Sequence, residues 1–357
     1  MSDVEMIDVD EGSSAPLPVI KTAKGKGKLV EDDVLNNNLP WVEKYRPQTL
    51  DEVVSHRDIT STIEKFIDKN RLPHLLLYGP PGTGKTSTIL AMARGIYGKD
   101  SRNNVLELNA SDDRGIDVVR EQIKNFASTR VFGGSAFKLV ILDEADMMTQ
   151  AAQAALRRVI EQYTRHVRFC IICNYVNKIV PAIQSRCTKF RFSPLKLDQV
   201  EERLDTVIKS EGVNITIDGK AAVIKLSKGD MRRALNVLQA CHAAYDVIDE
   251  ASVYSCTGNP HPADIERFVQ SMMNDEFTTS FNTITALKLD KGLALQDMIT
   301  GIYDFVDSVM FSAQSRIYLL DHLATIEHRL STGGSEKIQL SALLAAFKNA
   351  VALGNNK

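Results

Sequence analysis

Two patterns of hydrophobic residues divide the chain. From residue 40 to residue 195, short apolar runs alternate with stretches in which apolar residues recur every three or four positions. Short runs bounded by turn residues are typical of buried strands, and a period of about 3.6 residues is typical of amphipathic helices. Their alternation predicts an α/β fold with a parallel sheet and helices on both faces. We expect strands at Leu75–Tyr78 and residues 105–108, 139–142, 169–173 and 189–192, and helices at residues 86–97, 116–129 and 149–162.

Beyond residue 195 the strand pattern ends, and helical spacing continues alone. Residues 196–256 predict a small helical domain, with an amphipathic helix at residues 231–243. Pro260 and Pro262 mark a break, after which residues 257–357 predict a second helical domain. Its apolar stripes are typical of a bundle core or a subunit interface, and they comprise Leu295, Met298, Ile302, Phe305 and Val309, then Leu319, Leu323, Ile326 and Leu330, then Leu340, Leu344, Phe347 and Val351.

Composition narrows the class of protein. Of 357 residues, 44% are hydrophobic and 25% are charged, which excludes a collagen-like, wholly disordered or disulfide-scaffold chain. Lys and Arg number 43 against 45 Asp and Glu, so the net charge of −2 predicts no nucleic-acid partner unless a local basic patch exists. Residues 1–39 pass from an acidic block to a stretch rich in lysine and glycine, which predicts a flexible tail. The apolar runs are too short to cross a bilayer, so we expect no membrane association.

The five scattered cysteines favour a reducing compartment. Cys170 and Cys173 form a C-x-x-C pair, which in other contexts binds metal or takes part in redox chemistry. They lie in a predicted strand, where positions i and i+3 face opposite sides, and the chain has no second C-x-x-C. We therefore expect no metal site at these cysteines.

A phosphate-binding loop is the strongest motif in the sequence. Residues 79–86 (GPPGTGKT) fit G-x-x-x-x-G-K-[ST] between a predicted strand and a predicted helix, which is the context that the motif requires. Lys85 is expected to reach the β- and γ-phosphates of ATP, and the Thr86 hydroxyl to ligate Mg²⁺. The expected nucleotide-binding residues here are Tyr78, Gly79, Pro80, Pro81, Gly82, Thr83, Gly84, Lys85, Thr86 and Ser87.

A second motif supplies two carboxylates. The apolar residues 139–142 are followed by Asp143 and Glu144, which would lie at the ligand-binding edge of a parallel sheet. Asp143 is expected to hold Mg²⁺, and Glu144 to orient and deprotonate the attacking water. Acidic residues after a strand also cap helices, but together with the loop they favour ATP hydrolysis. The strand–helix unit at residues 105–129 separates the two motifs, so we expect one strand between their strands, as in additional-strand ATPases.

Residues 143–146 (DEAD) alone would also suit an RNA helicase of the DEAD-box class. Such helicases need a second RecA-like domain, whereas the chain after residue 195 is helical in pattern. This mismatch disfavours the helicase interpretation.

From residue 39 onward, the chain resembles AAA+ clamp-loader subunits, namely the small subunits of eukaryotic replication factor C. The resemblance rests on residues 41–47 (WVEKYRP), 79–86, 109–112 (NASD), 185–187 (SRC) and 229–232 (GDMR). Residues 174–179 (NYVNKI) are most similar to the subunits numbered three or five. The resemblance implies a RecA-like AAA+ core at residues 40–195, a helical lid at residues 196–256 and an all-helical collar at residues 257–357.

The resemblance also implies roles for residues outside the loop. Val42 and Arg46 would line the adenine pocket, Asn174 would be a first sensor of the γ-phosphate or attacking water, and Arg232 would be a second sensor on the lid. From the residues alone, Asn174 could merely end its strand and Arg232 could pair with a nearby acid.

Two further roles concern regulation and the neighbouring subunit. Arg186 would be an arginine finger that acts in trans on the ATP of a neighbour, and Asn109 would restrain Glu144 until DNA binds. An ordinary surface arginine is the alternative for Arg186.

One predicted helix carries a basic ridge. Arg114 precedes it, and Arg120 and Lys124 lie four residues apart on one face, which suits contact with a phosphate backbone. A solvated face with Glu121 beside it is an equal alternative, and the resemblance to clamp loaders favours DNA. The same helix carries Val119, Ile123 and Phe126, with Val131 and Phe132 beyond it. Part of this apolar set must lie in the core, and the tip of the helix is the candidate clamp-binding surface.

The resemblance implies a nuclear ATPase that loads a ring-shaped sliding clamp, proliferating cell nuclear antigen, at primer–template junctions. Its expected partners are the other replication factor C subunits of a hetero-pentamer, the clamp and DNA. The alternatives are a subunit that binds ATP without hydrolysing it, or an AAA+ helicase or remodeller, which should show aromatic pore loops that we do not find.

Overall fold

The computed structural model describes residues 39–53, 55–110, 116–129, 137–309 and 311–355, except the side chains of residues 99, 116–120 and 355. The chain divides into two compact units at the junction of Lys44 and Tyr45. Of the first unit, the described element is the short helix α2 (Trp41–Lys44). The elements that follow belong to the second unit.

A five-stranded parallel sheet confirms the predicted α/β core. Its strands are β1 (Leu75–Tyr78), β2 (Val105–Asn109), β3 (Lys138–Asp143), β4 (Val167–Cys173) and β5 (Thr188–Arg191), in the order β2-β3-β4-β1-β5. One strand does lie between the strands of the two motifs, β1 and β3, as expected. It is β4, however, and β2, which lies between the two motifs in the sequence, is an edge strand.

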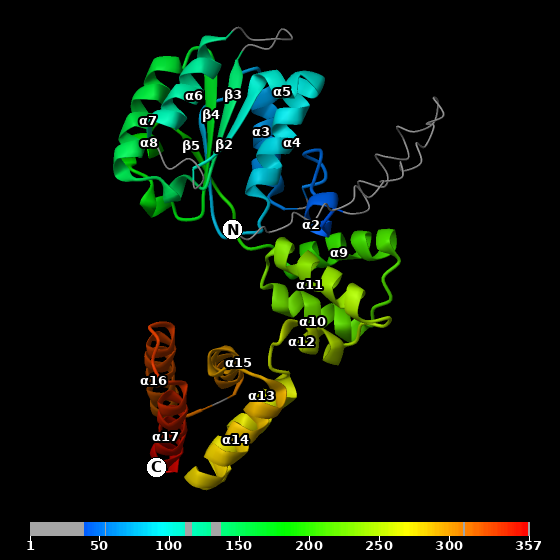
Figure 1. The fold of residues 1–357 in the computed structure, drawn as a ribbon, viewed down its shortest axis with the longest axis vertical. Coiled ribbons are helices and arrows are strands. Elements are labelled where there is room, and N and C mark those ends of the chain that lie inside the picture. The colour runs from blue at the N-terminus through cyan, green and yellow to red at the C-terminus, as the bar shows by residue number, and fades with distance from the viewer. Residues whose placement is uncertain (1–38, 54, 111–115, 130–136, 310, 356–357) are drawn as a thin grey trace, which may run out of the picture. The chain divides into compact units, whose positions relative to one another are not determined.

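Helices cover both faces of the sheet (Figure 1). Helices α3 (Arg57–Asp68) and α4 (Lys85–Tyr97) pack Ile63 and Met92 against the face of β1 that carries Leu75. Helices α6 (Ile116–Ser128), α7 (Gln150–Tyr163) and α8 (Pro181–Gln184) cover the face that carries Leu76. The two faces alternate because successive side chains of a strand point to opposite sides.

Short elements complete this part of the chain, namely η1 (Gly98–Asp100), α5 (Ser101–Asn104), η2 (Ala145–Met147) and η3 (Val176–Lys178). Cys170 belongs to one hydrophobic cluster and Cys173 to the other, which confirms that the two thiols face opposite sides of β4. Among the described residues, no group of three or more His, Cys, Asp or Glu side chains could hold a metal ion.

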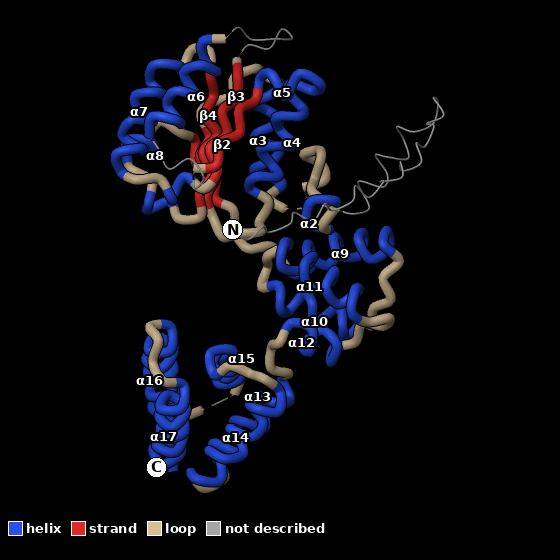
Figure 2. Tube along the Cα trace, in the orientation of Figure 1, coloured by secondary structure: helices blue, strands red, loops and turns tan. Residues whose placement is uncertain are grey.

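The chain after β5 is helical, as predicted (Figure 2). The first helices are α9 (Leu197–Glu211), α10 (Ile217–Ser227), α11 (Met231–Ala244) and α12 (Glu250–Thr257). Three of them have a side-chain N-cap. Thr216, Asp230 and Asp249 accept hydrogen bonds from backbone N–H groups in the first turns of α10, α11 and α12.

Five more helices share a single hydrophobic core: α13 (Pro262–Asn274), α14 (Phe277–Lys291), α15 (Leu295–Ser308), α16 (Ala313–Ser331) and α17 (Glu336–Asn355). Most residues of the predicted stripes lie in this core, including Ile302, Leu323 and Leu344. Val309 does not, because α15 ends at Ser308 and the helical spacing stops there, and Val306 is buried instead. The domain limits at residues 39, 195 and 256 stay predictions.

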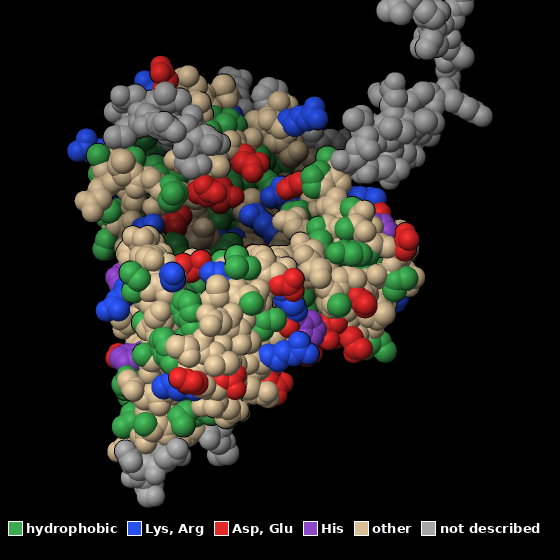
Figure 3. Space-filling model, turned by 60° about the horizontal axis from the view of Figure 1, so that its bottom comes forward, with side chains coloured by type: hydrophobic (Ala, Val, Ile, Leu, Met, Phe, Trp, Pro, Cys, Tyr) green, Lys and Arg blue, Asp and Glu red, His purple; other side chains and the backbone are tan. Residues whose placement is uncertain are grey.

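The described surface shows no face of one charge in the view of Figure 3, where basic and acidic side chains are interspersed. This distribution agrees with the net charge of −2. Among the described helices, none combines the length and the apolar character that crossing a bilayer requires.

A buried histidine predicts acid sensitivity of the core. His74 is 7% exposed, and its Nδ1 accepts a hydrogen bond from the backbone N–H of Phe169 at 3.1 Å. Burial, aided by the charge of Arg168, lowers the pKa of His74 from 6.5 to about 4. Below pH 6.5 the unfolded chain therefore takes up a proton that the folded chain refuses, so stability is lost as the pH falls toward 4.

We expect His74→Asn, which keeps a hydrogen-bond acceptor but cannot titrate, to make the free energy of unfolding less dependent on pH between about 6.5 and 4. Denaturant unfolding at a series of pH values measures this. Parallel curves for the two proteins would show that the histidine does not contribute to acid sensitivity.

Candidate active site

The phosphate loop joins β1 to α4, and its backbone depends on glycine. Gly82 has a φ of +67°, in the left-handed region, and a Cβ there would lie 1.6 Å from Oδ1 of Asp230. Glycine is therefore required at this position for both conformation and space. Gly84 is the N-cap of α4 and has no side chain, so the first N–H groups of the helix stay available to an anion.

Lys85 is the buried cation of the site. It is 7% exposed, and its Nζ donates to the carbonyls of Gly79 and Pro80, each at 2.8 Å, and to Oδ1 of Asn174 at 3.0 Å. Burial lowers the pKa of Lys85, while the charge of Asp143 opposes this shift. The structure thus brings together Lys85 and Asn174, which lie 89 positions apart in the sequence.

Thr86 and Asp143 form the second contact of the site. The Thr86 hydroxyl donates to Oδ2 of Asp143 at 2.8 Å, and the other carboxylate oxygen accepts the backbone N–H of Glu144 at 2.8 Å. A hydroxyl and a carboxylate are oxygen ligands of the kind that Mg²⁺ takes together with substrate phosphates. The donor set therefore fits the predicted ion.

Glu144 is exposed and has a strained backbone. Its φ of +52° is left-handed, which costs a non-glycine residue about 1–2 kcal/mol. Strain of this kind is often found at functional sites. Asn109 ends β2 directly beside Asp143 in the register of the sheet, so it lies one position from Glu144 across the strands. That Asn109 restrains Glu144 until DNA binds stays a prediction.

The sequence interpretation missed Asp146, which holds the backbone at Asn174. Oδ2 of Asp146 accepts the N–H groups of Asn174 and Tyr175 at 3.3 and 3.2 Å. The carboxylate is buried, and its Oδ1 has no hydrogen-bond partner within the described residues. The signal available in the sequence was the last letter of the DEAD motif.

Lid residues approach the phosphate loop at α11. The backbone N–H of Met231 donates to the carbonyl of Gly82 at 3.2 Å, and the positive charge of Arg232 contributes to lowering the pKa of Lys85. Arg232 is therefore near the candidate site, and its side chain is exposed.

The residues expected around the adenine are less completely placed. Arg46 follows Tyr45, whose hydroxyl donates to Glu211 of α9 and whose carbonyl accepts from Arg203 at 2.8 Å. Val42 belongs to the other compact unit, so its position relative to Arg46 is not described. Of the remaining loop residues, Gly79 and Thr83 are buried, Tyr78 and Ser87 are half-buried, and Pro80 and Pro81 are exposed.

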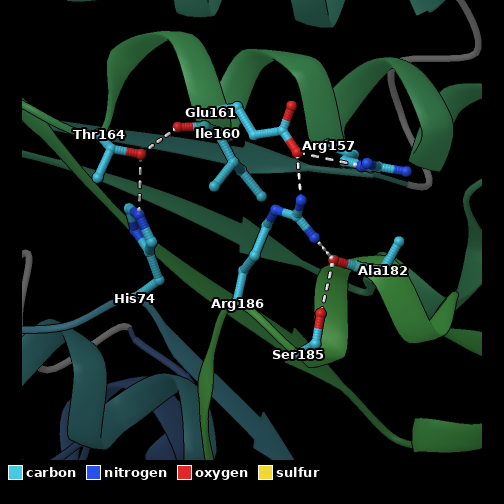
Figure 4. A network of polar contacts seen from close by, with 8 residues as sticks. All are labelled: His74, Arg157, Ile160, Glu161, Thr164, Ala182, Ser185 and Arg186. Atoms are coloured by element: carbon cyan, nitrogen blue, oxygen red, sulfur yellow. Dashed lines mark hydrogen bonds and ion pairs between the residues drawn. The ribbon is translucent and has the colours of Figure 1, made fainter.

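Arg186 does not join the Lys85 cluster. It follows α8, and its Nη1 donates to the carbonyl of Ala182 at 2.6 Å while its Nη2 pairs with Glu161 of α7 (Figure 4). Among the described residues no hydrogen bond or ion pair links it to Lys85, Asn174 or Asp143.

The predicted DNA and clamp residues are only partly described. Arg114, Val131 and Phe132 and the side chains of Arg120 and Val119 lie outside the described residues. Lys124 is exposed on α6. Ile123 is fully buried in the core, as expected for part of this apolar set. Phe126 is half-buried, with Nζ of Lys138 lying 4.6 Å from its ring centroid.

Two regions of the chain match models of known protein families. A family model described as "ATPase family associated with various cellular activities (AAA)" matches residues 75–195, and one described as "Replication factor C C-terminal domain" matches residues 260–346. Replication factor C subunit 3 of Schizosaccharomyces pombe is 63% identical over 92% of this chain and 97% of its own length. Replication factor C subunit 5 of Homo sapiens is 59% identical over 87% of this chain and 92% of its own length.

Among solved structures, the RuvB Holliday junction branch migration motor of Thermotoga maritima is similar, with a TM-score of 0.50 and 15% identity over 69% of this chain and 88% of that chain. At this identity the likeness shows the fold alone. The high identity of the relatives over nearly their whole length confirms the resemblance to subunits three and five. The chain belongs to the replication factor C small-subunit family of clamp loaders and carries a nucleotide-binding AAA ATPase domain.

Proposed function

We propose that this protein binds and hydrolyses ATP with Mg²⁺ in order to load a sliding clamp, proliferating cell nuclear antigen, onto primer–template DNA in the nucleus. The observation that carries the proposal is the cluster at the edge of the sheet, where Lys85 contacts Asn174 and Thr86 contacts Asp143. Family membership supports the coupling of this site to clamp loading.

The residues of the site divide the chemistry among them. Lys85 would hold the β- and γ-phosphates, and Thr86 and Asp143 would hold Mg²⁺, which neutralises charge that develops on the phosphates. Glu144 would accept a proton from the attacking water, and Asn174 would orient that water or the γ-phosphate.

Two alternatives remain weaker. A subunit that binds ATP without hydrolysing it has no need of Glu144 after Asp143, and both carboxylates are present here. The only support for a helicase or remodeller is the fold that this chain shares with RuvB. The C-terminal match is to replication factor C instead.

The partners follow from the same family. The relatives are named as subunits of replication factor C, which supports assembly with the other subunits, as a hetero-pentamer in our proposal. We assign DNA contact to Arg114, Arg120 and Lys124, of which the exposed Lys124 has its side chain described.

Lys85→Ala and Glu144→Gln test the site directly. Lys85→Ala should weaken ATP binding about 10- to 100-fold, because a hydrogen bond to a charged group contributes about 1.5–3 kcal/mol.

Glu144→Gln should keep ATP binding and lower turnover about 10²–10⁴-fold, because it removes the base alone. Nucleotide titration and a steady-state ATPase assay with clamp and DNA measure both, and equal loss of binding in the two variants would refute the separate roles.

Asp146→Ala should lower turnover about tenfold or more while ATP affinity changes little, because two backbone N–H groups beside the sensor lose their acceptor, at about 1–3 kcal/mol each. Asp146→Asn keeps one acceptor oxygen and should retain more turnover. Single-turnover hydrolysis and ATP titration measure the two effects. A loss of ATP binding as large as the loss of turnover would indicate a general structural role.

Arg186→Ala should leave ATP binding by this chain intact and slow hydrolysis at the adjacent subunit. Arginine fingers supply about 10³–10⁵ in rate for GTPases, so even a weaker effect is measurable. The measurement uses an assembly in which the phosphate loop of that neighbour alone is functional. Equal rates with and without the arginine would contradict a role in trans.

A further inference from the structure

The guanidinium of Arg186 is held between two helices of the core. Nη1 donates to the carbonyl of Ala182 in α8, and Nη2 pairs with Oε1 of Glu161 in α7 (Figure 4). A flexible arginine side chain is thus fixed from two directions before any neighbouring subunit is present.

Glu161 is itself held in place. Nε of Arg157, one helical turn earlier in α7, donates to the same Oε1 at 3.1 Å. The hydrogen bond from Arg157, followed by the charges of Arg186 and Arg157, lowers the pKa of Glu161. The carboxylate therefore stays ionised at neutral pH and keeps its pairing with both arginines.

This network is too exposed to matter much for folding. The side chains of Arg186 and Glu161 are 32% and 44% exposed, and ion pairs of this kind contribute about 0–1 kcal/mol to stability. Its physical effect is on conformation, because an arginine side chain loses rotamer freedom when it is held. Fixing the rotamer in advance reduces what must be ordered when the arginine meets its target.

The network also leaves the guanidinium open to an anion. Guanidinium has five N–H donors, and Ala182 and Glu161 engage one on Nη1 and one on Nη2. The remaining donors have no partner within the described part of the chain. An arginine that is held but not saturated suits recognition of phosphate oxygens supplied from outside.

We propose that Glu161 is a positioning residue for Arg186 and fixes the rotamer in which the guanidinium meets the triphosphate bound by the adjacent subunit. The inference rests on the proposed function of Arg186 in trans. The opposite role, a carboxylate that keeps the arginine away from the triphosphate, is disfavoured because the guanidinium keeps donors open to an anion while it is held.

The test uses the complete hetero-pentamer with full-length chains, in which the phosphate loop of the neighbour that Arg186 faces is functional and the other loops carry lysine-to-alanine substitutions. Glu161→Ala, Glu161→Gln, Arg186→Ala and the double variant Glu161→Ala with Arg186→Ala are compared. Arg158→Ala is the matched control, because Arg158 is an exposed arginine of the same helix outside this network. The readouts are kcat and KM for ATP with clamp and DNA, the melting temperature and the native mass.

Glu161→Ala should lower kcat about two- to fivefold, as expected for loss of an exposed ion pair, with KM, melting temperature and assembly as in the Arg158→Ala control. Glu161→Gln keeps an acceptor and should lie between Glu161→Ala and the unaltered assembly. The double variant should be no slower than Arg186→Ala alone, because Glu161 acts through Arg186.

The outcomes separate the two ideas. If Arg186→Ala leaves kcat unchanged, the role in trans fails and the positioning role fails with it. If Arg186→Ala slows hydrolysis but Glu161→Ala does not, the positioning role alone is overturned. Faster hydrolysis in Glu161→Ala would show that Glu161 restrains the arginine, and a double variant slower than Arg186→Ala would show an independent role; both would overturn the proposal.

Discussion

The order of strands in the sheet is the constraint on which the candidate site depends. With β4 between β1 and β3, the carboxyl ends of these three strands lie side by side. The loop after β1 then delivers Lys85 to Asn174, which follows β4, and Thr86 to Asp143, which ends β3. Ligands of open parallel sheets bind at this edge, because loops and helix N-termini converge there.

Burial of a lysine at this edge imposes a second requirement. A buried cation is tolerated when acceptors replace the water that it loses. The carbonyls of Gly79 and Pro80 supply two of them, and both belong to the same loop that would cradle phosphates. The loop therefore supplies two of the acceptors that its own buried lysine requires.

Local patterns in the sequence predicted the strands, the phosphate loop and the helical second half because each depends on neighbouring residues. Contacts between distant segments were not predictable in this way. The insertion of β4, the contact of Asp146 with the backbone at Asn174 and the pairing of Arg186 with Glu161 all depend on tertiary packing. Burial of Ile123 was not predictable either, because helical periodicity identifies an apolar face without saying which of its residues the core covers.

The close approach of Asp230 to Gly82 makes a single glycine a junction between two domains. The carboxylate that begins α11 occupies the space that a side chain at residue 82 would need, and the N–H of Met231 bonds to the carbonyl of the same glycine. A single substitution at residue 82 therefore has two effects, because it deforms the phosphate loop and displaces the lid at once. Defects that arise there cannot be assigned to nucleotide binding or to lid position by activity alone.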